Sequence, residues 1–156
     1  SHYVLDQLSI GDPVMVTAPM GSSYFRDEHT GPILCVAGGS GMAPIRSIAE
    51  TAIAKDGARE VHLYFGVRDE RDIYFEERFS ELARSHANFH FTPVLSEPLG
   101  ETVRRTGFVH EAVAADLGDF YGWKAYLCGP PVMVESVADL MKDRGVSEGD
   151  IYADAY

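Results

Sequence analysis

The chain has 156 residues, of which 46% are hydrophobic and 24% charged, a composition typical of one globular domain with a sizeable core. Acidic residues outnumber basic ones by 24 to 13, and the net charge of −11 argues against a nucleic-acid partner and an anionic membrane surface. Two cysteines without a CxxC pair exclude a disulfide scaffold and a Cys-rich metal or iron–sulfur site, and the six histidines lack metal-binding spacing.

Residues 1–32 differ from the rest of the chain. Gly11-Asp12-Pro13 predicts a turn, Val14–Val16 predicts a strand, and the polar stretch 22–32 predicts a linker or a loop over a neighbour. From Ile33 onward, strand and helix patterns alternate. The predicted strands are 33–37, 61–66, 88–95, 125–128 and 150–153, with helices from Pro44 to Gly57, around Phe75–Leu82, and at 108–115 and 132–141. This order predicts an α/β fold: a five-stranded, doubly wound parallel sheet with helices on both faces.

A glycine-rich turn follows the first predicted strand. Gly38, Gly39, Ser40 and Gly41 lie between that strand and a helix, and ligands of such sheets bind at the carboxyl ends of the strands. Glycines let a pyrophosphate approach the backbone, and the helix N-terminus favours its charge. The alternative is a tight turn without a ligand. The turn has neither the Walker A lysine nor the GxSxG pattern of hydrolases.

Two further turns lie at predicted carboxyl ends. The prolines of Cys128–Pro131 stiffen the backbone where it leaves a strand, so this turn either flanks a flat ring or merely starts a helix. No histidine lies near Cys128 in the sequence, which argues against a nucleophilic thiol. In the charged loop Arg68–Asp72, Arg68 or Arg71 would contact adenine or a phosphate, unless the loop is only solvated surface.

Two strings carry a family resemblance. VAGGSGMAPIRS at 36–47 and YLCGPPVM at 126–133 resemble the pyridine-nucleotide motifs of the ferredoxin–NADP reductase superfamily, and YFGVR at 64–68 and TGFV at 106–109 lie between them in the right order. Residues 8–16 and 18–21 resemble the last strand of that family's flavin barrel. Within the superfamily the chain looks most like reductase components of bacterial aromatic-ring dioxygenases and phenol hydroxylases, whose C-terminal end residues 150–156 resemble. Those proteins pass electrons from NAD(P)H through FAD to a [2Fe–2S] centre.

The resemblance implies a domain organisation. Residues 1–32 would be the end of a FAD-binding barrel and a linker, and residues 33–156 an NAD(P)-binding domain. The family's flavin-binding Arg-x-Tyr-Ser/Thr segment and its ferredoxin cysteines are missing from the sequence. We therefore expect a piece of a longer NAD(P)H:acceptor oxidoreductase that is not active alone. Its partners would be the FAD-binding domain of the parent chain and a ferredoxin domain or an oxygenase component of aromatic hydrocarbon catabolism. The free thiols and the absence of a signal-peptide or membrane-spanning pattern favour the cytoplasm.

The resemblance also implies the site residues. Ser40, Cys128 and Tyr156 would border the reacting rings as the catalytic positions. Hydride transfer needs no acid or base from the protein, so holding the two rings together would carry the catalysis. The cofactor-binding positions would be Gly38, Gly39, Ser40, Gly41, Met42, Pro44, Gly66, Arg68, Ser96, Glu97, Cys128, Gly129, Pro130 and Met133.

The pair Ser96-Glu97 bears on the choice of nucleotide. NADPH users of this superfamily commonly have Ser-Arg here, whereas the carboxylate of Glu97 would repel a 2′-phosphate and accept hydrogen bonds from a free ribose diol. We therefore expect NADH, while Arg68 and Arg71 leave an NADPH-using reductase as the alternative. A non-catalytic nucleotide-sensing module and a plain interaction domain are the rival classes. The intact glycine turns argue against the second of these.

Overall fold

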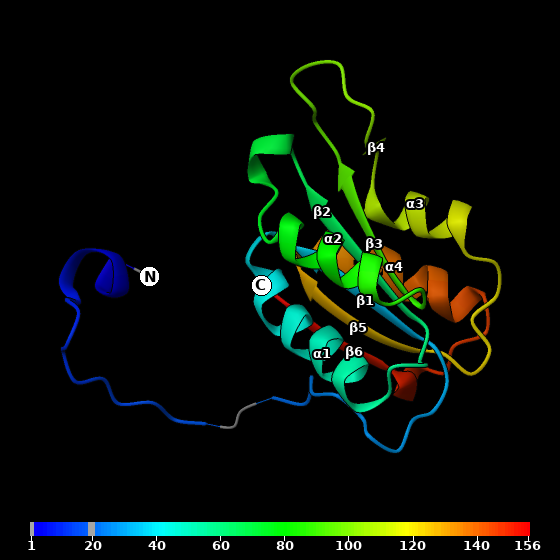
Figure 1. Ribbon diagram of the computed structural model, residues 1–156, viewed down its shortest axis with the longest axis horizontal. Helices are drawn as coiled ribbons and strands as arrows, with labels where there is room; N and C mark the ends of the chain where they lie inside the picture. The colour runs from blue at the N-terminus through cyan, green and yellow to red at the C-terminus, as the bar shows by residue number, and fades with distance from the viewer. Residues whose placement is uncertain (1, 19–20) are drawn as a thin grey trace.

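The central sheet of the computed structural model, which describes residues 2–18 and 21–156, is entirely parallel (Figure 1). Within these residues its six strands follow the order β4-β3-β2-β1-β5-β6. The strands are β1 (Ile33–Gly38), β2 (Val61–Val67), β3 (Phe89–Leu95), β4 (Arg105–Thr106), β5 (Lys124–Gly129) and β6 (Ile151–Ala155). The main helices are α1 (Met42–Lys55), α2 (Glu76–Ser85), α3 (Val109–Asp116) and α4 (Pro131–Asp143). The doubly wound α/β fold predicted from the sequence is confirmed.

The sheet has one strand more than the five predicted. The additional strand, β4, has two residues, and Arg105 and Thr106 pair with Val94 and Leu95 at the end of β3. Both residues of β4 are exposed. Such a short polar strand leaves no alternating pattern in the sequence, so only its pairing with β3 reveals it.

Two apolar layers cover the two faces of the sheet. Helices α1 and α2 pack on one face around Phe65 and Phe79, and α3 and α4 pack on the other around Tyr64 and Val137. Strand β1 lies between them and is buried at every position, as its continuous apolar run predicts. Its Cys35 is fully buried, and this burial raises the pKa of the thiol well above its usual range. Among the described residues no helix is long and apolar enough to cross a bilayer.

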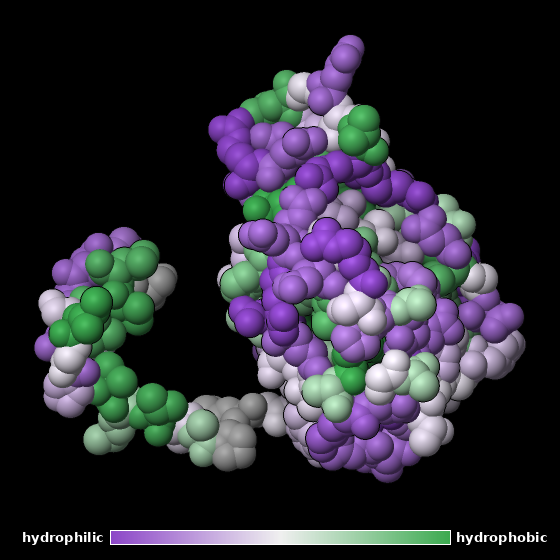
Figure 2. Space-filling view, in the orientation of Figure 1, coloured by the Kyte–Doolittle hydropathy of each residue, from purple (hydrophilic) through white to green (hydrophobic). Residues whose placement is uncertain are grey.

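The segment 2–18 stands apart from the sheet (Figure 1). It forms a short π-helical turn at Tyr3–Gln7, and the strand predicted at Val14–Val16 is not formed. A strand needs a hydrogen-bonded neighbour, and the backbone hydrogen bonds of this segment are local, such as Leu8 N–H to Tyr3 O at 3.1 Å. Figure 2 shows its apolar side chains facing solvent. Pro19 and Met20, within the string that resembles a barrel strand, lie outside the described residues.

The polar stretch after residue 21, for which the sequence predicts a linker or a loop over a neighbour, contacts two strands of the sheet. The Arg26 backbone N–H donates to the Tyr126 hydroxyl at 3.0 Å, and the guanidinium lies 3.4 Å from the Tyr24 ring centre and 4.1 Å from that of Tyr152. Tyr152 in turn stacks on Tyr126 with 5.3 Å between the ring centres. These contacts bind the stretch to β5 and β6.

Candidate functional site

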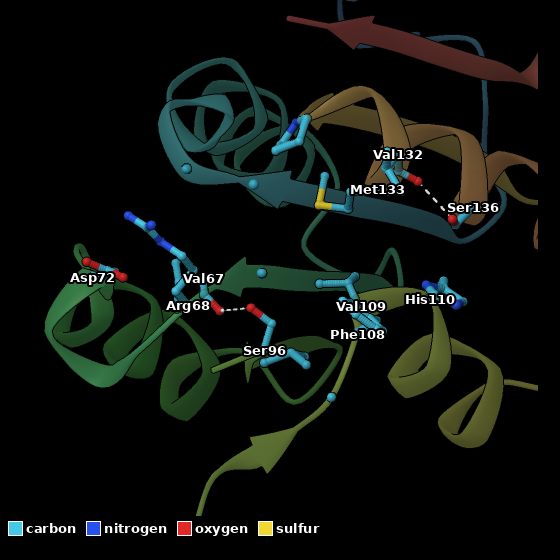
Figure 3. Close-up of a pocket in the computed structure, with 16 residues that line it drawn as sticks. Val67, Arg68, Asp72, Ser96, Phe108, Val109, His110, Val132, Met133 and Ser136 are labelled. Carbon is cyan, nitrogen blue, oxygen red and sulfur yellow. Dashed lines mark hydrogen bonds between the residues drawn. The ribbon is translucent and has the colours of Figure 1, made fainter. Parts of the chain in front are cut away.

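A large cavity lies at the carboxyl ends of the strands. It has a volume of about 590 Å³, within the range of small-molecule and cofactor sites, and its lining is mainly apolar (Figure 3). Seven of the predicted cofactor-binding residues line it: Gly38, Gly39, Gly66, Arg68, Ser96, Pro130 and Met133. Residues from four different strand ends thus meet in one place.

The strand order explains why the cavity opens there. Strands β1 and β5 are neighbours, but the helix that follows β1 packs on one face of the sheet and the helix that follows β5 packs on the other. The segments that leave β1 and β5 therefore run to opposite faces of the sheet and leave a gap between them. Open α/β sheets bind ligands at such a switch point. Gly38 ends β1 and Gly129 ends β5, so the two predicted turns do form facing walls.

Most glycines of these turns serve close packing. A Cβ on Gly41 would lie 2.1 Å from the Cys128 carbonyl oxygen, and one on Gly66 would lie 2.4 Å from a methyl group of Val109. Gly129 has a φ of +149° and lies against the Gly38 backbone. The turns can approach each other only because these positions lack side chains.

Gly39 differs from the packing glycines. Its φ is +50°, and a Cβ built on it meets nothing within 4 Å. Its carbonyl oxygen accepts a 2.6 Å hydrogen bond from the Tyr74 hydroxyl, which orients the turn. Gly39 is exposed and lines the cavity, so here the backbone itself faces the open space, just before the N-terminus of α1. This is the arrangement that lets a phosphate approach peptide N–H groups.

The three predicted catalytic residues gather beside the cavity without lining it. The Ser40 hydroxyl donates to the Tyr156 hydroxyl at 2.9 Å, and the Tyr156 backbone N–H donates to the Gly129 carbonyl oxygen at 3.2 Å. Cys128, one residue before Gly129, is only 1% exposed. Burial and the charge of Asp154 raise the pKa of its thiol, while the Tyr156 hydroxyl acts in the opposite direction. The raised pKa favours the neutral thiol near pH 7.

Seven predicted cofactor-binding positions do not line this cavity: Ser40, Gly41, Met42, Pro44, Glu97, Cys128 and Gly129. Gly41 and Met42 are buried, and Pro44 lies half-buried in the first turn of α1. Met42 contributes to the apolar core between α1 and the sheet. The sequence alone makes every residue of the glycine-rich motif a candidate for ligand contact. In the folded turn only Gly39 and Ser40 are exposed.

A second cavity of about 270 Å³ adjoins the first and shares Arg68 and Asp72 with it. Its lining includes three acidic residues, Asp69, Asp72 and Glu97, and two basic residues, Arg68 and Arg71. Asp69 accepts a 2.8 Å hydrogen bond from Arg71, which with the Leu99 N–H lowers the pKa of its carboxyl. A backbone hydrogen bond holds Glu97 in position: its N–H donates to the Arg68 carbonyl oxygen at 2.8 Å. Acidic groups therefore outnumber basic ones at this end of the cleft.

The comparison with known proteins assigns the family. Residues 35–139 match the family model described as the oxidoreductase NAD-binding domain. The chain belongs to this family. Over its full length it is 44% identical to the ferredoxin–NAD(P)(+) reductase component of the naphthalene 1,2-dioxygenase/salicylate 5-hydroxylase systems of a Ralstonia species, of which it covers 48%. Over 99% of its length it is 33% identical to the reductase component of phenol 2-monooxygenase from Pseudomonas sp. strain CF600, of which it covers 44%.

A solved structure supports the same assignment. The cytochrome P450 reductase of Amycolatopsis superposes on 97% of this chain with a TM-score of 0.89 and 39% identity, and the match covers 46% of that chain. The predicted resemblance to oxygenase reductase components and the predicted NAD(P)-binding fold are thus confirmed. The NAD-binding domain spans about half the length of the curated relatives it matches.

One wall of the NAD-binding domain's cavity consists of residues that the sequence did not predict. This wall comes from the N-terminal end of α3, where Phe108 and Val109 face the opening, and from Val132 and Ser136 on α4 (Figure 3). Gly107, with a φ of +107°, turns the chain from β4 into α3. Three residues of the string TGFV, Gly107, Phe108 and Val109, thus belong to the cavity lining, in addition to the predicted site residues. The role of this string as a strand–glycine–helix turn becomes visible only once β4 is known.

The loop between β3 and β4 is anchored to α2 and to the turn before it. Arg104 holds the carboxylate of Glu76 with two hydrogen bonds of 2.6 and 3.1 Å, and the Thr102 hydroxyl donates to Glu70 at 2.5 Å. The Leu99 backbone N–H donates to Asp69 at 3.1 Å. These contacts hold Leu99 against the smaller cavity, so that end of the cleft has a defined shape before any ligand binds.

The burial of Cys128 leads to a prediction about its reactivity. We expect alkylation of Cys128 in the Tyr156→Ala variant to be about tenfold faster than in the unmodified chain at about pH 7.5, because the variant removes the side chain beside the thiol. Tyr156→Phe keeps the aromatic ring, so we expect alkylation of Cys128 in this variant to stay slow. Iodoacetamide labelling followed by peptide mass spectrometry measures both rates. Cys35, buried in β1, serves as the internal control, and equal rates in all three proteins would show that Tyr156 does not shield Cys128.

Proposed function

We propose that this domain binds NADH across the two joined cavities and presents its nicotinamide to an FAD held by a neighbouring domain of a longer reductase chain. The observation that carries the proposal is the cleft at the β1–β5 switch point, where the open backbone of Gly39 and the Pro130 turn face each other. Its volume and apolar lining fit a dinucleotide. NADH, when bound, supplies the hydride that such a reductase passes on.

The residues suggest how the dinucleotide lies. Gly39 and the N-terminus of α1 would receive the pyrophosphate, because peptide N–H groups and the helix dipole favour negative charge there. Pro130 and Met133 would support the nicotinamide end, and Arg68 with Glu97 would hold the adenosine end. The domain's own task is orientation, since hydride transfer depends on the alignment of the two rings.

The cluster of Ser40, Cys128 and Tyr156 would form the side of the site that faces the flavin. The cluster adjoins the cavity wall, because Ser40 follows Gly39 and Tyr156 is hydrogen-bonded both to Ser40 and to the Gly129 carbonyl oxygen. We propose that Tyr156 keeps water from the nicotinamide side until the flavin ring takes its place. Cys128 would contact the ring as a neutral, compact side chain and not as a nucleophile.

The segment 1–32 is proposed to be the end of a FAD-binding barrel and its linker, with the NAD-binding domain covering 33–156. The apolar side chains of Val14, Met15 and Val16 are exposed, as expected for a strand whose partners lie elsewhere. The matched relatives are reductase components of oxygenase systems. We therefore propose FAD in the same parent chain, a [2Fe–2S] centre in that chain or a partner, and an oxygenase as acceptor. Two free thiols fit a reducing cytoplasm.

The smaller cavity favours NADH over NADPH. A 2′-phosphate placed there would meet three carboxylates, and Arg71 is already engaged by Asp69 at 2.8 Å. A free ribose diol can instead donate hydrogen bonds to Glu97, which is exposed at the cavity. The negative charge of this cavity thus disfavours the 2′-phosphate, the group that distinguishes NADPH from NADH.

Replacing Glu97 by arginine tests both the site and the preference. We expect Glu97→Arg to shift the ratio of the NADH and NADPH dissociation constants toward NADPH by about tenfold, because a repulsive carboxylate becomes a phosphate-binding guanidinium. Isothermal titration calorimetry of this chain with each nucleotide measures the ratio.

Glu101→Arg is the matched control, since it makes the same charge change on the same loop outside both cavities. An equal shift in the two variants would assign the effect to net charge and contradict the pocket. If the unmodified chain bound neither nucleotide, the proposed function itself would fail.

A further inference from the structure

A second cluster of ligand-type side chains lies at the opposite end of the sheet from the nucleotide cleft. Glu60 directly precedes β2, His62 is the second residue of β2, and His90 is the second residue of β3. The carboxylate and imidazole atoms of these three residues that can bind a metal all lie within 4.8 Å of one another. We propose that the Glu60–His62–His90 cluster binds a divalent transition-metal ion of the zinc type and joins β2 to β3.

The register of the sheet creates this cluster. His62 and His90 are directly paired across the two parallel strands, so their side chains leave the same face at the same level. Glu60 precedes His62 by two positions and lies on that face too. Its carboxylate already contacts the His62 Nε2 atom at 2.8 Å. Two histidines 28 positions apart in the sequence thus become neighbours through strand pairing alone.

The donor set selects the kind of ion. Two imidazole nitrogens and one carboxylate oxygen suit Zn²⁺, Ni²⁺ and Cu²⁺, whereas Mg²⁺ and Ca²⁺ prefer oxygen ligands throughout. Three protein ligands leave a fourth position of a tetrahedral site for water. The net charge of −11 further favours the approach of a cation.

Metal binding requires small side-chain rotations. The two imidazole rings stack with 4.4 Å between centres and 26° between planes, and because the nitrogen lone pairs lie in the ring planes, one ring has to turn. A tetrahedral zinc site with its usual bond lengths places neighbouring ligand atoms about 3.4 Å apart. His90 and Glu60 are exposed and can turn without disturbing the core. His62 is half-buried beside Trp123, with 5.4 Å between the ring centres, and forms the fixed corner of the site.

Trp123 provides a local reporter because it is the single tryptophan of the chain. A paramagnetic Ni²⁺ ion held by His62 would lie close to the Trp123 ring and quench its fluorescence. The titration is made in a His2→Gln background, which removes the exposed His2–Asp6 pair as a competing ligand. We expect saturable quenching by one equivalent of Ni²⁺, and recovery of the fluorescence when Zn²⁺ displaces it.

Substitutions within the cluster test whether Ni²⁺ binds to these three residues. His90→Gln, at an exposed position, is expected to weaken Ni²⁺ binding by about tenfold or more through the loss of one imidazole ligand, and Glu60→Gln to weaken it by a smaller factor. His86→Gln, outside the cluster, is the matched control and is expected to bind like the background protein. Circular dichroism checks that each variant is folded. Quenching that is absent, that does not saturate, or that is unchanged in His90→Gln would overturn the proposal.

Discussion

Gly41→Ala is expected to lower the free energy of unfolding by about 3 kcal/mol or more, because the added methyl group would collide with backbone rather than with a movable side chain. The new Cβ would lie 2.1 Å from the carbonyl oxygen and 2.5 Å from the carbonyl carbon of Cys128. Relief would require β1 and β5 to separate at the switch point, where they form part of the cleft. The loss of stability should therefore be measurable in the absence of any nucleotide.

Urea unfolding followed by circular dichroism measures this change. Gly100→Ala is the matched control, since a Cβ there meets nothing within 4 Å and its φ is not positive. Gly39→Ala separates the two kinds of glycine. A Cβ at position 39 meets no atom within 4 Å, so only the φ of +50° opposes the substitution. We expect it to lower the free energy of unfolding by about 1 kcal/mol. A loss below about 1 kcal/mol for Gly41→Ala would mean that the turn shifts easily and that close packing is not its role.

Arg68→Glu is expected to weaken NADH binding by about tenfold to thirtyfold, because the guanidinium becomes a carboxylate at the point where the two cavities meet. Arg68 is the arginine that lines the larger cavity, where Asp72 also contributes a charge. A charge reversal there replaces attraction of the dinucleotide by repulsion. Since Arg68 is exposed, the difference should shrink as the ionic strength rises.

Calorimetric titration at low and at moderate salt measures the effect. Arg84→Glu on α2 makes the same change in net charge outside both cavities and is the matched control. If the two variants lose equal affinity, the effect belongs to the overall charge of the protein. If Arg68→Glu loses none, the adenosine end of the nucleotide does not lie at the second cavity, and the proposed orientation is wrong.

The site was partly predictable because its ligand-facing elements follow strands with strong patterns. The apolar run of β1 and the glycines behind it located one wall, and the Cys128–Pro131 turn located the facing wall. What the pattern did not separate is the task of each glycine. Gly39 faces the cavity whereas Gly41 packs on β5, and this difference depends on backbone angles and on the distance between two turns that lie about 90 residues apart.

Two errors about secondary structure have related causes. Val14–Val16 has strand propensity but no strand forms, since the described part of the chain offers it no hydrogen-bonded neighbour. Arg105 and Thr106 form too short a run to predict a strand, yet they form β4 because they pair with Val94 and Leu95 at the edge of the sheet. In both cases the presence or absence of a partner overrides the local preference.

By itself the sequence determined the fold class, the position of the glycine turns and the family resemblance, because these depend on short-range periodicity and on contiguous motifs. Only the tertiary structure decided which motif residues face the cavity, that Cys128 is covered, and that α3 supplies a wall. It alone also brought His62 beside His90. The physical reason is the same throughout: such contacts arise from strand order and register, which join residues that no local pattern connects.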